Sequence, residues 1–344
     1  MSEHRPTRVS LLATPESTAS TLYGLFDVLG SVGIAWATFI SGKPVEPRFD
    51  VRIVAKDREP FRCNGNVLVT PHDAVEDVGE TDIALIAALN LPATSAPKEF
   101  DKGVCDWLIH QQSRGTMIAS ACTGAILLAR TGMLNGGEAT SHFAYRDLFR
   151  VYFPEVKMRM NQNLCVSGPH NRIVTSGGAT AWQELALYLI TKYCGVDHAI
   201  QTAKFWLIPG REELQASFAS ISKGISHEDN VVSKCQTWIA EHYGIENPVA
   251  AMVEYSGLPS TTFARRFKQA TGYRPMEYVH ALRVEEAKQM LETDRNAVDK
   301  IGREVGYEDP ASFRRIFKRT VGLTPSIYRR KFGRDRFERL SQFG

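Results

Sequence analysis

The sequence predicts two structural classes in one chain: an α/β domain with a parallel sheet over residues 1–215, and an all-α domain with two helix-turn-helix units after residue 229. Short β-branched or apolar runs that alternate with helical patterns predict the first class. A pattern of aromatic, glycine and proline residues that occurs twice, fifty positions apart, predicts the second. Charge agrees with the division, because residues 230–344 hold 20 Lys and Arg against 14 Asp and Glu, whereas residues 1–229 hold 21 against 24.

Four runs in the first part have the length and composition of buried strands. They are residues 9–13, 49–55, 83–88 and 116–120. Three segments between or after them have helical patterns, at residues 101–112, 124–130 and 181–193. Because ligands of open parallel sheets bind beyond the carboxyl ends of the strands, we expect a binding site at that edge.

One of these strand ends carries a cysteine at a strand-to-helix turn. Cys122 follows the strand at 116–120, and Gly124 allows the next helix to pack closely, which is the plan of a nucleophile elbow. A thiol near a helix N-terminus has its thiolate form favoured by the macrodipole. His142 follows twenty residues later and could form a dyad with Cys122. A small core cysteine and a structural histidine are the alternatives.

Over about residues 8–208 the chain resembles the PfpI-type branch of the class I glutamine amidotransferase-like superfamily, which implies a flavodoxin-like fold. Cys122 and His142 match the cysteine and histidine of that branch in order and spacing. The glutamate that hydrogen-bonds the cysteine in many members should lie near Ser20 and Thr21, where the chain has no carboxylate. Glu16 is the nearest and is misplaced. This departure favours a catalytically silent sensor over an enzyme.

The sequence therefore predicts a ligand pocket around the cysteine, with no catalytic residue, no metal and no cofactor. Its expected members are Cys122, Thr123, His142, Asn90 and Trp182. Asn90 follows a strand and Trp182 follows a glycine-rich strand end, although a steric role for the glycines and a core role for Trp182 are alternatives. A redox-sensing role for Cys122 also stays open, because exposed thiols of low pKa oxidise readily.

The C-terminal part repeats one pattern. Each copy consists of a short helical pattern, at residues 248–256 and 298–305, a glycine turn and a second helix. This is the helix-turn-helix plan, in which the second helix lies in the DNA major groove. A longer helical pattern at residues 275–291 connects the copies. The residues Phe263, Phe267, Gly272, Pro275 and Tyr278 recur as Phe313, Phe317, Gly322, Pro325 and Tyr328.

The two phenylalanines of each second helix share one face, so the opposite face is available to DNA. Arg265 and Arg315 suit guanine edges, whereas lysine and arginine nearer the helix C-termini suit phosphates. A solvated basic face is the alternative, and the repetition disfavours it. The predicted DNA contacts are Thr261, Ala264, Arg265 and Lys268 in the first copy, and Ala311, Ser312, Arg315, Lys318 and Arg319 in the second. Arg266 stands where the second copy has Ile316, so the first buried stripe is narrower.

Over about residues 229–332 the repeat resembles the DNA-binding domain of the AraC/XylS family, which implies two units in successive major grooves. With the PfpI-like part, the chain resembles AraC-family regulators that respond to small nitrogenous metabolites such as amino acids or betaines. The expected function is a sequence-specific transcription activator. Its expected partners are a double-stranded DNA operator, RNA polymerase, a small-molecule effector and a second copy of the chain. The alternative is a PfpI-type hydratase or hydrolase that uses Cys122.

Membrane and secretion signals are missing from the sequence: no run of 18 apolar residues and no secretory h-region occur. The six cysteines are dispersed without metal-site spacing. We therefore expect a cytoplasmic protein with reduced thiols and no membrane partner. The expected organisation is a sensing and dimerisation domain at 1–215, a linker at 216–229, a DNA-binding domain at 230–333 and a polar tail at 334–344.

Overall fold

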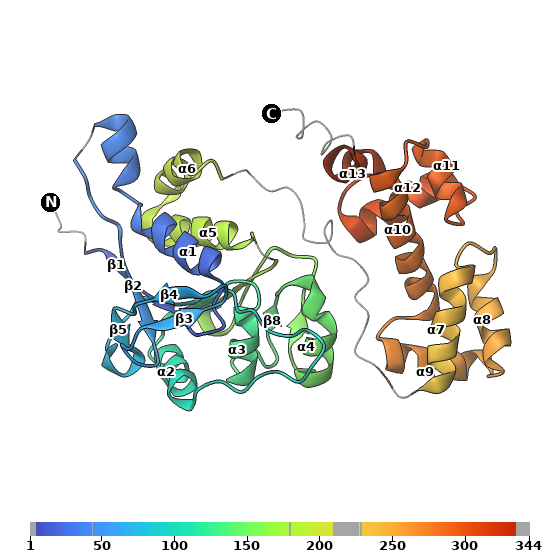
Figure 1. Cartoon of the computed structure of the whole chain (residues 1–344), viewed down its shortest axis with the longest axis horizontal. Coiled ribbons are helices and arrows are strands. Elements are labelled where there is room, and N and C mark those ends of the chain that lie inside the picture. Colours follow the sequence, from blue (N-terminus) through green and yellow to red (C-terminus); the bar gives the residue numbers. More distant parts are fainter. Residues whose placement is uncertain (1–4, 43, 179, 209–226, 228, 335–344) are drawn as a thin grey trace. The chain divides into compact units, whose positions relative to one another are not determined.

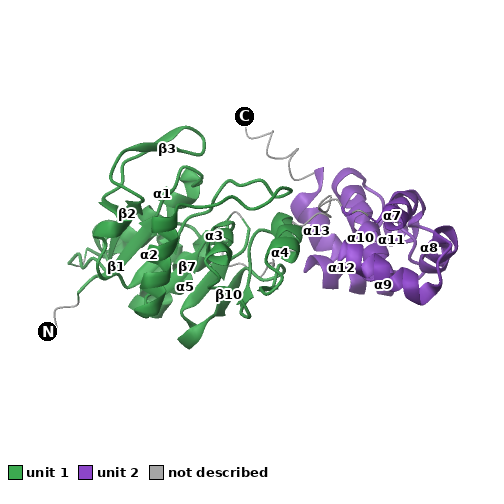
Figure 2. Ribbon diagram, turned by 90° about the horizontal axis from the view of Figure 1, so that it is seen from below, with its two compact units in different colours: residues 1–215 green, residues 216–344 purple. Residues whose placement is uncertain are grey.

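The computed structural model (Figure 1) describes residues 5–42, 44–178, 180–208, 227 and 229–334. The chain divides into two compact units, Met1–Gln215 and Ala216–Gly344 (Figure 2). Most of the predicted linker at 216–229, and all of the predicted tail at 334–344 except Arg334, lie outside the described residues.

The first unit is built on a seven-stranded sheet with the order β10-β11-β7-β6-β1-β2-β5. Six strands are parallel, and β10 is antiparallel to its neighbour β11. The strands are β1 Thr7–Leu12, β2 Phe49–Ala55, β5 Asp73–Ala74, β6 Ile83–Ile86, β7 Met117–Ser120, β10 Leu164–Ser167 and β11 Ile173–Ser176. The four predicted strands are confirmed as β1, β2, β6 and β7, whereas β5, β10 and β11 were not predicted.

Helices cover both faces of this sheet (Figure 1). They are α1 Ala19–Gly30, α5 Trp182–Cys194 and α6 Val196–Phe205 on one face, and α2 Lys102–Ser113, α3 Gly124–Arg130 and α4 Arg146–Tyr152 on the other. The predicted helices at 101–112, 124–130 and 181–193 are confirmed as α2, α3 and α5. Two small ribbons complete the unit: β3 Phe61–Cys63 with β4 Val67–Val69, and β8 Glu138–Ala139 with β9 Lys157–Met158.

The central strand β6 shows why the sheet residues are apolar in unbroken runs. Ile83 and Leu85 pack in the core under α1 and α5, whereas Ala84 and Ile86 pack in the core under α2 and α3. All four side chains are fully buried. A parallel strand with both faces covered has no solvent-facing side, so the polar positions of a half-exposed strand are missing.

In residues 229–334 the second unit contains seven helices. The helices are α7 Asn230–His242, α8 Pro248–Ser256, α9 Ser260–Thr271, α10 Pro275–Thr293, α11 Val298–Glu304, α12 Pro310–Val321 and α13 Pro325–Phe332. The pairs α8–α9 and α11–α12 are the two predicted helix-turn-helix units, and α10 runs between the two groups (Figure 1). Every helix among the described residues is too short or too polar to span a membrane.

The repeated aromatic residues form the same cluster twice. Tyr278 meets Phe267 edge to face with centroids 5.4 Å apart, and Tyr328 meets Phe317 in the same way at 5.6 Å. The glycine of each copy ends its helix in the left-handed conformation, at φ 80° and 84°. Each copy therefore has its own apolar core, and the two cores share α10.

A buried arginine on α10 joins the two copies. Arg283 is 4% exposed and donates to the carbonyl oxygens of Tyr243 at 2.8 Å, Ile245 at 2.8 Å and Gly306 at 2.6 Å. Its guanidinium carbon lies 5.2 Å from the centroid of Tyr307. The first two carbonyls follow α7, and the third lies in the turn between α11 and α12. Arg283 therefore fixes the first unit against the second.

We expect Arg283→Met to destabilise residues 229–334 by about 2–4 kcal/mol, because three partly buried carbonyl groups lose their charged donor. Amide hydrogen exchange of the full chain, followed peptide by peptide, measures the effect as faster exchange in α7–α13. Arg303→Met is the matched control, because Arg303 is an exposed arginine on α11. Equal exchange in the two variants would contradict the role assigned to Arg283.

Candidate nucleic-acid interface and the Cys122 elbow

The helices α9 and α12 each bury an aromatic face and expose the opposite one. Phe263, Phe267, Phe313 and Phe317 are completely buried. The predicted DNA contacts lie away from them: Thr261, Ala264, Arg265, Lys268, Ala311, Arg315, Lys318 and Arg319 are exposed, and Ser312 is half-buried. The structure therefore presents each predicted set on one helix.

The cations of these two helices fall into two groups. Arg266 forms two hydrogen bonds with Asp229, at 2.8 and 2.9 Å, and Arg314 pairs with Asp299. Arg266 thus replaces the apolar contact made by Ile316 in the other copy with an ion pair to the N-cap of α7. In contrast, the predicted contacts Arg265, Lys268, Arg315, Lys318 and Arg319 form no ion pair among the described residues, although the charge of Arg315 is near enough to Asp309 to help lower the pKa of that carboxyl. Their charges remain available to an anionic partner.

The two helices differ at their N-termini. The Asp309 carboxylate caps α12 by accepting from Ala311 N at 3.0 Å and Ser312 N at 2.9 Å. These hydrogen bonds, first of all that from Ala311, lower the pKa of Asp309. The Ser312 hydroxyl also hydrogen-bonds Asp309, so it is shared between the cap and any base contact. No side chain caps α9, which begins after Pro259.

In the first unit, Cys122 has the backbone of an elbow between β7 and α3. Its φ is 53°, in the left-handed region that residues other than glycine seldom adopt. The strained turn is held by a hydrogen bond from Cys122 N to Ser176 O at 3.0 Å. A Cβ on Gly124 would lie 2.9 Å from Ala87 O, so the close packing predicted for this glycine is confirmed.

Loops from several strands gather at this edge. Thr123 accepts a hydrogen bond from Leu89 N at 2.8 Å through its hydroxyl, which ties the elbow to the segment that carries Asn90. Asn90 donates through its backbone to Glu16 O at 2.8 Å and through its amide to Asn64 at 3.0 Å. Thr123 and Asn90 therefore lie in one network beside Cys122, at the carboxyl ends of β6 and β7.

The Cys122 thiol is protonated at neutral pH. The residue is 7% exposed, and burial raises the pKa of its thiol to about 11, against hydrogen bonds from Thr123 and the His142 backbone. The expectation that α3 favours the thiolate is therefore wrong. A helix dipole contributes about 0.3–1 kcal/mol, whereas burying an ionised group costs several kcal/mol.

His142 stands near the cysteine without forming a dyad. Its Nδ1 accepts a hydrogen bond from Ala144 N at 3.2 Å, which places the proton of the neutral ring on Nε2. Burial lowers the pKa of His142, so the neutral form predominates. The His142 backbone hydrogen-bonds the Cys122 thiol. No described contact joins a ring nitrogen of His142 to that thiol. An activated cysteine would need the imidazole itself in that place.

Two other residues of the sequence analysis are occupied elsewhere. The Trp182 ring packs so closely on α1 that a Cβ on Gly24 would lie 2.7 Å from it, which supports the core alternative for Trp182. Glu16 pairs with Lys98. Burial alone would raise the pKa of Glu16, but hydrogen bonds from Lys98 and Thr14 lower it. No described contact joins Glu16 to the thiol.

The sequence gives no signal for two buried hydroxyl groups near the elbow. Ser120 ends β7 and Ser176 ends β11, and both are completely buried. Neither Oγ has a hydrogen-bond partner among the described residues. An unpaired buried hydroxyl costs about 1–3 kcal/mol, so each calls for a partner such as a water or a ligand.

Comparison with known proteins agrees with this architecture. The profile of the DJ-1/PfpI family matches residues 36–192, and that of a helix-turn-helix domain matches residues 252–331. The chain is 23% identical over 308 residues to the HTH-type transcriptional regulator CdhR of Pseudomonas aeruginosa, with 88% of each chain covered. It is 28% identical over 193 residues to the isonitrile hydratase of Pseudomonas putida, covering 56% of this chain and 74% of the hydratase.

The fold of the first unit also occurs in a solved structure. A protein from Vibrio parahaemolyticus matches 58% of this chain over 99% of its own length, with a TM-score of 0.50 and 20% identity. The fold and the two profiles define a helix-turn-helix transcription regulator that carries a DJ-1/PfpI-type α/β domain. The matched DJ-1/PfpI and helix-turn-helix domains are the combination expected from the sequence for AraC-family regulators with a PfpI-like N-terminal domain.

We expect Arg265→Ala and Arg315→Ala each to weaken specific DNA binding by about 1–3 kcal/mol and to relax the preference at one base position. Lys318→Ala should weaken binding to all sequences alike and flatten the salt dependence. Binding titrations on an operator and its single-base variants distinguish the two effects. Arg314→Ala is the control, because Arg314 is already paired with Asp299. Identical behaviour of all these variants would contradict the division into base and phosphate contacts.

We expect Cys122 to react slowly with iodoacetamide in the folded protein, because only the thiolate is nucleophilic and burial keeps the thiol protonated. The alkylation rate, followed by mass spectrometry of the Cys122 peptide, should rise about tenfold per pH unit between about pH 7 and 9.5. The same peptide in urea-unfolded protein provides the reference. A rate that levels off below about pH 8 would instead indicate an activated thiolate.

Proposed function

We propose that this protein is a sequence-specific transcription activator that contacts its operator through α9 and α12 and is controlled by a small metabolite bound beside Cys122. The observation that carries the proposal is the set of unpaired cations on α9 and α12. Neighbouring arginines on the same helices are neutralised by Asp229 and Asp299, whereas the predicted contacts are not. The cations that form no ion pair can contact DNA phosphates and base edges.

The chemistry of the elbow supports a ligand that forms hydrogen bonds rather than a substrate. The Cys122 thiol and the His142 imidazole are both neutral at pH 7, and the Ser120 and Ser176 hydroxyls lack partners among the described residues. Sulfur and hydroxyl oxygen accept hydrogen bonds from N–H groups. A small nitrogenous metabolite, such as an amino acid or a betaine-related amine, would use the thiol and one of these hydroxyls, because Ser120 and Ser176 lie on opposite faces of the sheet.

The proposal includes the remaining expected partners. A transcription activator acts on RNA polymerase, and a homodimer would present four helix-turn-helix units to paired half-sites. Double-stranded DNA is the partner for which the AraC-type domain gives direct support. A cytoplasmic location agrees with six free cysteines.

A PfpI-type hydratase or hydrolase is the alternative function. Its support is the similarity to the isonitrile hydratase of Pseudomonas putida. The buried thiol of Cys122, with a pKa of about 11, and the absence of a hydrogen bond from the His142 ring among the described contacts both oppose it. Turnover that Cys122→Ser abolishes would favour the enzyme.

The test of the proposed regulator measures the coupling between the effector site and the DNA-binding site. A thermal-shift screen of amino acids and betaines against the full chain identifies a compound that stabilises it. Calorimetric titration of that compound, with and without operator, should give different affinities, because coupling between two sites is reciprocal. Cys122→Ser should retain DNA affinity without the compound, whereas Cys122→Trp should abolish the response by filling the elbow. Equal compound affinities with and without operator would contradict control through DNA affinity.

A further inference from the structure

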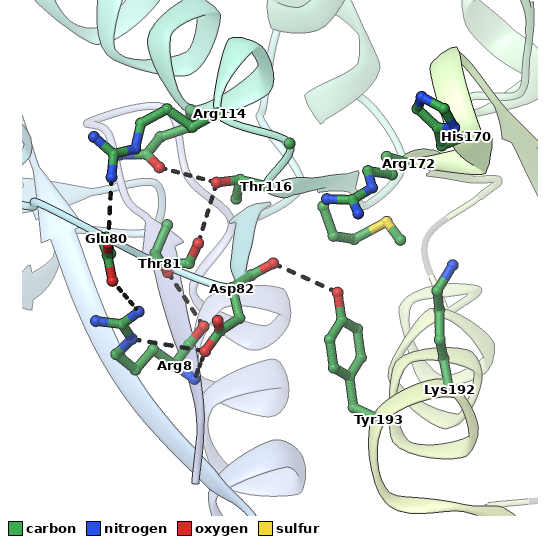
Figure 3. A pocket seen from close by; sticks show the side chains of 13 residues that line it. Arg8, Glu80, Thr81, Asp82, Arg114, Thr116, His170, Arg172, Lys192 and Tyr193 are labelled. Atoms are coloured by element: carbon green, nitrogen blue, oxygen red, sulfur yellow. Dashed lines mark hydrogen bonds and ion pairs between the residues drawn. The ribbon is translucent and has the colours of Figure 1, made fainter. Parts of the chain in front are cut away.

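A second polar site lies at the opposite edge of the same sheet. A cavity of about 680 Å³ opens at the amino ends of β1, β6, β7 and β11 (Figure 3). It is lined by Arg8 near the start of β1, Asp82 and Thr116 just before β6 and β7, and Arg172 just before β11. The strand β7 has four residues, about 13 Å in length, and separates this cavity from Cys122.

The floor of the cavity is a buried polar network with its hydrogen bonds satisfied. The Thr116 hydroxyl lies 3.0 Å from Gln111 Oε1 and 3.1 Å from Thr81 O. Gln111 is completely buried and donates from Nε2 to Gly79 O at 3.1 Å. These contacts hold the floor rigid and leave the charged rim to contact whatever enters.

The rim has acids on one side only. Arg8 lies 3.1 Å from Glu80 and 3.6 Å from Asp82, and Arg114 lies 3.4 Å from Glu80. Figure 3 shows this paired group on one side of the cavity and Arg172, Lys192 and His170 on the other. The lining therefore has two more Lys and Arg side chains than Asp and Glu side chains, four against two.

The extra cations are Arg172 and Lys192. No carboxylate among the described residues pairs with either of them, and Lys192 contacts only the face of Tyr188, at 5.8 Å from its centroid. Tyr193, whose hydroxyl lies 3.5 Å from Asp82 O, stands between the two sides (Figure 3). A cationic pair beside a rigid polar floor is the usual arrangement for binding an anion.

The backbone makes room for Arg172. Gly115 has a φ of 80°, and a Cβ at this position would lie 2.8 Å from Arg172 Nη1. The Cβ of any other residue at position 115 would therefore displace the Arg172 guanidinium from its place near the start of β7. The Arg172 backbone is also fixed, because its carbonyl accepts from Ile118 N at 2.8 Å. The backbone of Arg172 is thus fixed, and its exposed side chain lines the cavity wall.

We propose that this cavity binds a small organic anion that carries a carboxylate or phosphate group, with Arg172 and Lys192 as its charge partners. The guanidinium matches either group with two parallel hydrogen bonds, and the lysine adds a single charge. The Tyr193 and Thr116 side chains line the same space and supply polar contacts. The site is separate from the Cys122 elbow and does not rest on DNA binding.

Calorimetric titration of inorganic phosphate and of succinate into the full chain, at ionic strength held constant with sodium chloride, tests this site and separates the two chemistries. We expect at least one probe to bind the native protein, and the double substitution Arg172→Gln with Lys192→Gln to weaken that binding at least tenfold. Gly115→Ala should also weaken it, because the new methyl group displaces the guanidinium. The double variant should melt within a few degrees of the native protein in the absence of probe, whereas Gly115→Ala should melt lower because its residue has a φ of 80°.

The matched control is Arg62→Gln with Lys204→Gln, which removes one exposed arginine and one exposed lysine of the same unit outside the cavity. This control should bind the probe as the native protein does. Equal weakening in both double variants would reduce the effect to general electrostatics and overturn the site. Absence of binding by the native protein for both probes, up to about 10 mM, would overturn it as well.

Discussion

The DNA-binding half depends on one buried guanidinium. Each helix-turn-helix unit has its own apolar core, and the two cores are separate clusters on α10. Arg283 adds a polar link between them, because its hydrogen bonds reach backbone carbonyls on both sides, at Tyr243 and Gly306. Carbonyl oxygens compensate the charge where no carboxylate does. Two helices can read one duplex only at a fixed separation, so the recognition that we propose for α9 and α12 depends on this contact.

Local patterns predicted most of the fold, since their physical cause is local. The fifty-residue repeat gave the clusters around Phe267 and Phe317, because an aromatic pair at i and i+4 must bury one helix face. The edge strand β10 has only four residues, of which one is buried and one exposed, too short a signal to be recognised. The burial of Arg283 was also not predicted, because an arginine on a helix that mixes apolar and charged residues is expected to lie in solvent. Its burial follows from carbonyls 23 to 40 positions away.

The elbow shows the same limit in its chemistry. Sequence predicted the turn at Cys122, and the left-handed backbone of that residue and the glycine contact confirm it. Protonation did not follow from the sequence, because it depends on how many neighbours exclude water from the sulfur. Burial prevails over the dipole of the seven-residue helix α3 and leaves a neutral thiol. A neutral thiol is a poor nucleophile and a slow target for oxidants, and this argues against both the enzyme and the redox-sensor hypotheses.

The sheet constrains how an effector at the elbow can act. Its central strand β6 is buried on both faces, and a core packed at such density moves between discrete states rather than bending gradually. A ligand can shift an equilibrium only through a difference in its contacts with two states. The elements able to supply two states lie outside the strands, in the loops that carry Asn90 and His142. These loops hydrogen-bond to the elbow through Thr123 and the Cys122 thiol. In the proposed regulator, the movement that follows effector binding would therefore belong to those loops, with the sheet as the fixed frame.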